Sequence, residues 1–243
     1  TSLMNSPDFS QAPAYWVGGP AAGVGSRMGA SFPKQYLCLL GKTVLEHTLE
    51  RLQSIPVVNN IHLALAADDH FWPTLGCAKD ENIIRVAGGR ERADSVLNGL
   101  NALPAQAKDT DWVLVHDAAR PCIRVQEIVK LIETVGDHPV GGILGVPVSD
   151  TLKQVSGAVI DKTIDRNPLW QAQTPQLFRM ELLRDCLLRA LTEGKIITDE
   201  ASAVEAYGYH PLMVQGRSDN IKITRQEDLA IAAMLMQQQN NIG

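Results

Sequence analysis

The order of apolar segments restricts the fold of this chain more than any other feature. Six apolar runs of strand length alternate with amphipathic stretches, at residues 14–19, 61–66, 83–87, 112–116, 142–148 and 212–215. Continuous apolar strands separated by helices are typical of parallel strands that are covered on both faces. The alternation therefore predicts an α/β fold with a doubly wound, mostly parallel sheet.

The stretches between the apolar runs have helical periodicity. Their apolar side chains recur at spacings of three and four over residues 43–55, 92–103, 125–135, 180–193 and 227–236. The first stretch begins with Thr43-Val44-Leu45-Glu46, in which Thr43 and Glu46 are expected to form a capping box. Thr198 precedes Asp199-Glu200 and is expected to cap a further helix.

The segment 149–174 interrupts this alternation. It reads as short β pieces with turns, at 154–159 and 162–165, and we expect an arm that leaves the body of the fold. We expect one folded domain over residues 14–236 that includes this arm. The polar ends, residues 1–13 and 237–243, are expected to be flexible tails.

Composition excludes several classes of protein. Hydrophobic residues make up 45% of the chain and charged residues 20%, which rules out a disordered tail protein. A net charge of −5 offers no general attraction to nucleic acid, and no apolar run is long enough for a membrane span. Cys38, Cys77, Cys122 and Cys186 are widely spaced, as in reduced thiols of a cytoplasmic protein, and form no metal-binding motif.

The loop after the first apolar run has the composition of a phosphate-binding loop. It reads PAAGVGSRM at 20–28, and its glycines allow successive backbone amides to face one anion. A tight turn between a strand and a helix would use the same residues, and the loop matches neither the Walker nor the dinucleotide pattern. Arg27 and Lys34 place two cations close by, which favours a bound triphosphate over an ordinary surface pair.

Further motifs follow this loop in a fixed order. They are PKQYL at 33–37, GGRERADSV at 88–96, HDAARP at 116–121, TDEAS at 198–202 and NIK at 220–222. With these motifs, the sequence from about residue 17 to 229 resembles the 2-C-methyl-D-erythritol 4-phosphate cytidylyltransferase family of the non-mevalonate isoprenoid pathway. The first motif is shared with many sugar nucleotidyltransferases, whereas the later ones are specific. The resemblance implies a Rossmann variant of the nucleotide-diphospho-sugar transferase type.

The resemblance also implies a reaction. The family transfers CMP from CTP to 2-C-methyl-D-erythritol 4-phosphate and releases pyrophosphate, by in-line attack of a phosphate oxygen on the α-phosphorus. Such chemistry needs positioning and charge stabilisation rather than an enzyme nucleophile. A cofactor, Mg²⁺ or another divalent cation, would be held mainly by the CTP phosphates, with Asp117 as a candidate ligand.

Site residues carry over from the family motif by motif. Catalytic roles fall on Arg27, Lys34, Arg166 and Lys222. The nucleotide is assigned to Pro20, Ala21, Ala22, Gly23, Gly25, Gly89, Ser95, Asp117 and Ala118. The acceptor is assigned to Asp117, Arg120, Thr151, Arg166, Thr174, Thr198 and Lys222. Taken alone, Gly89 and Ser95 also fit a glycine turn with a helix cap, Asp117 and Arg120 a salt bridge, and His116 a hydrogen-bonding residue without a role as base.

Three alternatives to this function stay open. The acceptor could be another polyol phosphate such as ribitol 5-phosphate, or the chain could be a non-catalytic nucleotide sensor. A purely structural α/β protein would not explain the co-occurring motifs.

Gly18-Gly19 departs from the family, in which β-branched residues are expected, and leaves the rigidity of the nucleotide loop in question. The partners expected are CTP, a sugar-alcohol phosphate and a second copy of the chain joined through the arm, across which Arg166 would reach the partner's pocket.

Overall fold

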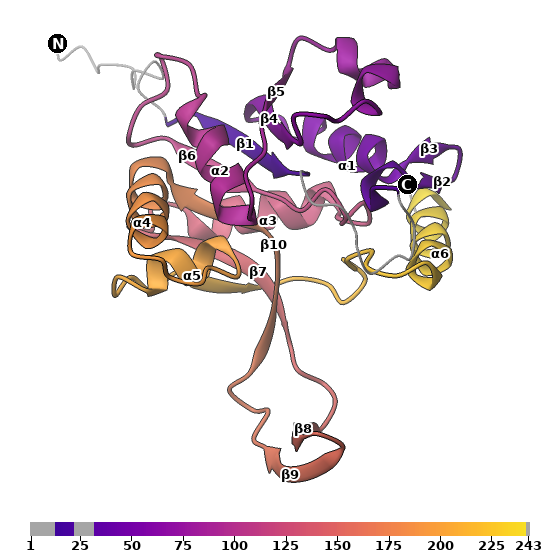
Figure 1. Ribbon diagram of the computed structural model, residues 1–243, viewed down its shortest axis with the longest axis vertical. Helices are drawn as coiled ribbons and strands as arrows, with labels where there is room; N and C mark the ends of the chain where they lie inside the picture. The colour runs from indigo at the N-terminus through magenta and orange to yellow at the C-terminus, as the bar shows by residue number, and fades with distance from the viewer. Residues whose placement is uncertain (1–12, 22–31, 242–243) are drawn as a thin grey trace, which may run out of the picture.

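A seven-stranded sheet forms the centre of the molecule. The computed structural model describes residues 13–21 and 32–241, and the strand order is β11-β7-β10-β6-β1-β4-β5 (Figure 1). The strands are β1 Tyr15–Pro20, β4 Val58–Leu65, β5 Ile83–Ala87, β6 Trp112–Val115, β7 Gly141–Pro147, β10 Trp170–Arg179 and β11 Leu212–Gln215. β10 runs antiparallel to β6 and β7, and the other neighbouring pairs are parallel. The predicted α/β fold with a mostly parallel sheet is confirmed.

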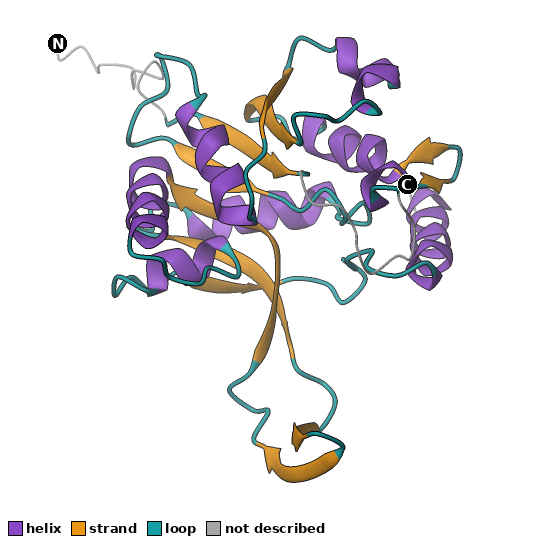
Figure 2. Cartoon of the chain, in the orientation of Figure 1, coloured by secondary structure: helices purple, strands orange, loops and turns teal. Residues whose placement is uncertain are grey.

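Helices cover both faces of this sheet (Figure 2). They are α1 Val44–Gln53, α2 Arg92–Asn101, α3 Val125–Val135, α4 Met180–Thr192, α5 Glu200–Glu205 and α6 Glu227–Asn241. Short elements complete the described chain: the 3₁₀ helices η3 Lys34–Tyr36, η4 Trp72–Thr74 and η5 Gly76–Lys79, and the paired strands β2 Cys38–Leu39 with β3 Lys42–Thr43 and β8 Leu152–Ser156 with β9 Val159–Ile164.

Two hydrophobic layers enclose the sheet because its strands are buried on both sides. Along β6, Trp112 and Leu114 pack with α1 and α3, whereas Val113 and Val115 pack with α2, α4 and α5. This alternation across one strand is what a doubly wound sheet requires. A third cluster joins α6 to β2 and the start of α1, through Leu39, Val44 and Ala232.

Local signals in the sequence explain where helix α1 begins. The Thr43 hydroxyl accepts from the Glu46 N–H at 3.1 Å, and the Glu46 carboxylate accepts from the Thr43 N–H at 2.7 Å. The predicted capping box is therefore present. The N-cap of α5, in contrast, is Asp199 rather than Thr198, because the Asp199 carboxylate accepts from the Ser202 N–H at 2.8 Å.

The arm between β7 and β10 extends away from the body (Figures 1 and 2). The hairpin β8–β9 lies at its end, and its apolar side chains Val155, Val159 and Ile160 are 51%, 69% and 59% exposed. Residues 170–174 were expected to belong to this arm, but they are part of the central sheet. They form the first half of β10, where Trp170, Gln171 and Ala172 pair with the end of β7.

The C-terminal segment also differs from expectation. Residues 237–241, predicted as a flexible tail, continue helix α6. The Gln239 side chain donates to the Cys122 carbonyl at 2.9 Å and accepts from Arg51 at 2.9 Å, which fastens this polar turn to the body. Across the described ranges, none of the helices is both long enough and apolar enough to cross a membrane.

Candidate functional site

Two adjoining pockets open at the carboxyl end of β6, the first also beside the ends of β1 and β5 and the second beside β10. The first has a volume of about 230 Å³ and the second of about 260 Å³. Arg92, Asp117 and Lys222 line both pockets and form the wall that they share. Open α/β sheets place their ligands at the carboxyl ends of the strands, so this is where the fold favours a binding site.

The first pocket gathers the described residues that the sequence assigned to the nucleotide. These are Pro20, Ala21, Gly89, Ser95, Asp117 and Ala118, together with the cations Lys34 and Lys222. Ala22, Gly23, Gly25 and Arg27 lie outside the described residues. The buried Gln35 side chain donates to the Ala21 carbonyl at 2.7 Å, which fixes η3, and with it Lys34, beside the end of β1.

The turn after β5 requires glycine. A Cβ on Gly89 would lie 2.1 Å from the Cβ of Asp94, so a larger residue would push the start of α2 away. The Gly89 N–H donates to the Ser95 hydroxyl at 3.0 Å, and that hydroxyl donates to the Glu91 carbonyl at 3.3 Å. Glu91, rather than Ser95, is the N-cap of α2. The glycine turn is therefore present, and both Gly89 and Ser95 still face the pocket.

Three cations surround the carboxylate of Asp117 in the shared wall. Arg92 contacts Oδ1, while Arg120 Nε and Lys222 Nζ lie 3.3 Å and 3.5 Å from Oδ2. Burial alone would raise the pKa of Asp117, but Arg92, Lys222 and Arg120 hold it well below its usual range. The carboxylate is therefore ionised at neutral pH. Asp117 forms the salt bridge with Arg120 and also lines both pockets.

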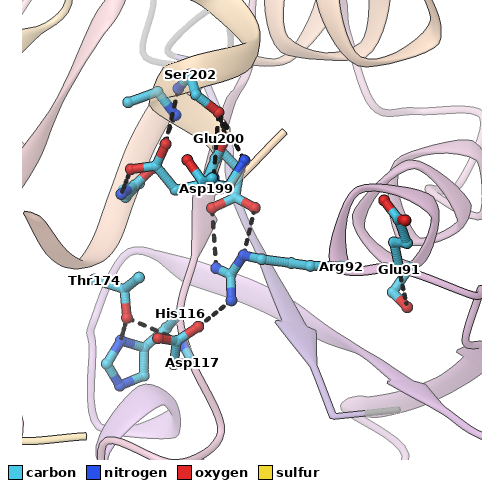
Figure 3. A network of polar contacts seen from close by, with 12 residues as sticks. Glu91, Arg92, His116, Asp117, Thr174, Asp199, Glu200 and Ser202 are labelled. Carbon is cyan, nitrogen blue, oxygen red and sulfur yellow. Dashed lines mark hydrogen bonds and ion pairs between the residues drawn. The ribbon is translucent and has the colours of Figure 1, made fainter. Parts of the chain in front are cut away.

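A chain of hydrogen bonds with a fixed direction supports this wall (Figure 3). His116 is fully buried, and burial lowers its pKa to about 4, so its ring is neutral. Its Nε2–H donates to the Arg120 carbonyl at 3.1 Å, since a carbonyl only accepts, which leaves Nδ1 to accept from the Thr174 hydroxyl at 2.9 Å. Thr174 in turn accepts from the Asp117 N–H at 3.0 Å. His116 thus has the hydrogen-bonding role predicted for it.

The second pocket brings together most of the residues predicted for the acceptor. Asp117, Arg120, Thr174, Thr198 and Lys222 line it. Thr151 and Arg166 do not line either pocket of their own chain, because both are exposed on the arm. The structure of one chain thus separates these two from the residues with which they were grouped.

The sequence predicted no role for Arg92 or Glu200, although they lie within the motifs at 88–96 and 198–202. Each is the first residue of a helix, α2 or α5, and the Arg92 guanidinium donates to both Glu200 oxygens at 2.9 and 3.0 Å. Figure 3 shows Arg92 between Glu200 and Asp117. A charged residue at the start of a helix beside a predicted ligand loop was the available signal, but nothing local in the sequence pairs residue 92 with residue 200.

Asp117 does not fit the part of a direct metal ligand in this arrangement. Both of its oxygens contact cations, and Mg²⁺ favours uncommitted oxygen ligands in octahedral geometry. Within residues 13–21 and 32–241, no three His, Cys, Asp or Glu side chains gather as a metal site would require.

Comparisons with known proteins point to one family. Residues 17–238 match the family model described as IspD: 2-C-methyl-D-erythritol 4-phosphate cytidylyltransferase. The chain is similar to the protein of that name from Vibrio vulnificus, with 54% identity over 223 residues that cover 91% of this chain and 94% of the relative. The relative from Pseudomonas putida is 52% identical over 219 residues, which cover 89% and 93%. A crystal structure of the Francisella tularensis protein superposes with a TM-score of 0.81 at 38% identity and covers 91% of this chain and 99% of that one.

Proposed function

The chain belongs to the 2-C-methyl-D-erythritol 4-phosphate cytidylyltransferase family, and we propose that its two joined pockets bind the two substrates of that reaction. The enzyme is a nucleotidyltransferase that moves CMP from CTP to 2-C-methyl-D-erythritol 4-phosphate. The relatives carry the name of this activity, so ribitol 5-phosphate is not favoured as the acceptor.

The shared wall is the observation that carries the assignment of the pockets. Arg92, Asp117 and Lys222 face both cavities. CTP in the first pocket and the sugar phosphate in the second would therefore meet across this wall. Bringing two anionic substrates together needs cations on both sides, which Lys34, Lys222 and Arg120 supply.

The reaction at this wall needs no enzyme nucleophile. An oxygen of the acceptor phosphate attacks the α-phosphorus of CTP, the bond to the β-phosphate oxygen breaks, and pyrophosphate leaves in line. Lys34, with Arg27 outside the described residues, is proposed to stabilise the charge that grows on the phosphoryl oxygens. His116 is neutral and its ring nitrogens are already hydrogen-bonded, so it does not act as a base.

The base is proposed to lie between the end of β1 and the turn after β5. Pro20, Ala21 and Gly89 are small or rigid there, and Ser95 presents a buried hydroxyl. Polar groups that match the amino edge of cytosine would be left unpaired by uracil, and this mismatch is the basis for selecting CTP.

We place the acceptor phosphate between Arg120, Lys222 and the partner's arm. The arm leaves Val155, Val159 and Ile160 exposed, and an isolated hairpin is marginal in water. Pairing with a second copy would cover them and would bring Arg166 and Thr151 to a neighbouring acceptor pocket. The exposed apolar side chains support this homodimer, as does the absence of Arg166 from the pockets of its own chain.

A divalent ion, Mg²⁺ in this proposal, is expected to arrive with the triphosphate. Both Asp117 oxygens already contact cations, so the phosphate oxygens of CTP would be the main ligands of the ion, which supports this proposal. When bound, the ion would neutralise phosphate charge.

We also propose a cytoplasmic location, in keeping with the free thiols of Cys38, Cys77, Cys122 and Cys186.

Pyrophosphate release measures the proposed specificity. Wild-type protein is assayed with Mg²⁺ and each of CTP, UTP, ATP and GTP, in the presence of either methylerythritol phosphate or ribitol 5-phosphate. We expect turnover with CTP and methylerythritol phosphate, and a much lower kcat/KM for every other pair. Equal kcat/KM with UTP would refute the base pocket, and a preference for ribitol 5-phosphate would refute the acceptor.

A further inference from the structure

Arg92 lies between two buried carboxylates that come from different parts of the fold. Its guanidinium donates two hydrogen bonds to the Glu200 carboxylate and also contacts the Asp117 carboxylate (Figure 3). Burial opposes the charge of Arg92, but Glu200 and Asp117 more than offset this and raise its pKa above the usual range. The start of α2, the start of α5 and the end of β6 are thereby joined through one cation.

A purely structural ion pair would account for only part of this arrangement. The Glu200 side chain is 1% exposed and needs a cation, which Arg92 supplies. Yet the Arg92 side chain is 23% exposed, lines both pockets and reaches a second carboxylate. The contact with Asp117 is therefore additional to what burying Glu200 requires.

That contact divides the two oxygens of Asp117 between different cations. Oδ1 faces Arg92, and Oδ2 faces Arg120 and Lys222. Arg120 and Lys222 are the cations that an acceptor phosphate would use, so the carboxylate and the phosphate compete for them. The strength of this competition depends on how many Asp117 oxygens can turn toward Arg120 and Lys222.

We propose that Arg92, anchored by Glu200, is a positioning residue that holds Asp117 Oδ1 away from Arg120 and Lys222. The acceptor phosphate then competes with a single carboxylate oxygen for these two cations. Without Arg92, Asp117 is free to rotate and to pair with Arg120 through both oxygens, the stronger bidentate form. This inference rests on the proposed function, because it concerns the acceptor pocket of the same reaction.

Removing both members of the anchoring pair separates positioning from stability. Arg92→Met alone would leave Glu200 buried without a cation, whereas Arg92→Met/Glu200→Met replaces the pair by apolar side chains, which proteins often tolerate. For the double variant we expect a Tm close to that of the wild type and a KM for methylerythritol phosphate raised by about tenfold, the value of one charge-assisted contact. The KM for CTP should stay within about twofold, because Lys34 and Lys222 still supply cations to the nucleotide pocket and the double variant removes one charge of each sign.

Arg92→Lys provides a second test that keeps a cation beside Glu200. A single ammonium lacks the planar fork and cannot serve both carboxylates in the same way. We expect a Tm near the wild-type value and again a raised KM for the acceptor. Arg184→Met is the matched control, since Arg184 is 31% exposed, pairs with Asp109 and lines neither pocket. It should leave both KM values unchanged.

Each of the other results would overturn the proposal. A wild-type acceptor KM in either the double variant or Arg92→Lys would show that the pair only stabilises the fold. An equal rise in the KM for CTP would place Arg92 with the nucleotide instead. Should the double variant not fold, Arg92→Lys decides alone. Failure of the proposed function is distinct, because the wild type itself would then release no pyrophosphate.

Discussion

The buried, neutral His116 should make the stability of this protein depend on pH in a defined window. Burial lowers the pKa of His116 from 6.5 to about 4. Between these values the unfolded chain binds a proton at His116 that the folded chain does not. The free energy of unfolding therefore falls as the pH drops through this window, and it is fully recovered above pH 6.5.

The size of this effect follows from the two pKa values. Lowering the pH from roughly 7.5 to 5 should cost about 2 kcal/mol through His116 alone, from about 1.4 kcal/mol per pKa unit. Other groups, including the buried His62, whose pKa is also lowered by burial, add to the total pH dependence. A difference between wild type and His116→Gln isolates the contribution of His116, because Gln does not titrate.

Urea unfolding followed by tryptophan fluorescence measures this difference, since Trp16 and Trp112 are buried in the core. Protein concentration is held constant because the proposed dimer would make the stability depend on it. His116→Gln should be less stable at neutral pH, yet should lose about 2 kcal/mol less than the wild type on acidification. Equal losses in both proteins would refute the conclusion that His116 is buried as a neutral donor and acceptor.

Three further perturbations test the site and the fold. Lys34→Ala, like Arg27→Ala, should lower kcat about 100- to 1,000-fold with little change in Tm, and near-normal turnover would remove Lys34 from the catalytic role. Arg166→Ala should raise the KM for methylerythritol phosphate but not for CTP. Mixing this variant with Lys34→Ala should restore activity, because each heterodimer has one site in which Lys34 and the partner subunit's Arg166 are both intact. If subunit exchange restores no activity, Arg166 does not act in the site of the other subunit. Gly18→Ala should raise the free energy of unfolding by about 0.5–1 kcal/mol in urea, because the new Cβ would lie 3.9 Å from Val115, at ordinary contact distance. A destabilised Gly18→Ala variant would show that β1 needs glycine there.

The sequence predicted the elements whose signals are local and apolar. The capping box of Thr43 and Glu46 and the buried strand β6 follow directly from residue pattern, and both are present. Pocket residues that stand directly after a strand, such as Gly89 and Asp117, could also be found, because parallel strands end at one edge of the sheet.

The sequence did not predict strand β10 because several of its buried side chains are polar. Gln173, Thr174 and Gln176 are buried in the middle of the strand, where an apolar pattern is expected. Long-range hydrogen bonds satisfy them: Gln176 donates to Asp199 at 2.9 Å and Gln173 to the Arg217 carbonyl at 2.9 Å. All three side chains line the second pocket, and local sequence rules often fail where a strand lines a candidate site.

The anchoring of Arg92 by Glu200 and the helical end of α6 have the same cause. Each depends on partners more than 100 residues apart in the chain, Arg92 with Glu200 and Gln239 with Cys122. No pattern within one segment reports such contacts. They become visible only once the topology places the segments side by side.

Transfer of labelled oxygen tests the proposed reaction most directly. Methylerythritol phosphate that carries ¹⁸O in its phosphate group is incubated with CTP, Mg²⁺ and the wild-type protein. The products are then separated, and their masses are measured by mass spectrometry. In-line attack of the acceptor phosphate on the α-phosphorus predicts that CDP-methylerythritol retains all of the label and that pyrophosphate carries none. Label in the pyrophosphate, or release of pyrophosphate without CDP-methylerythritol, would contradict the account.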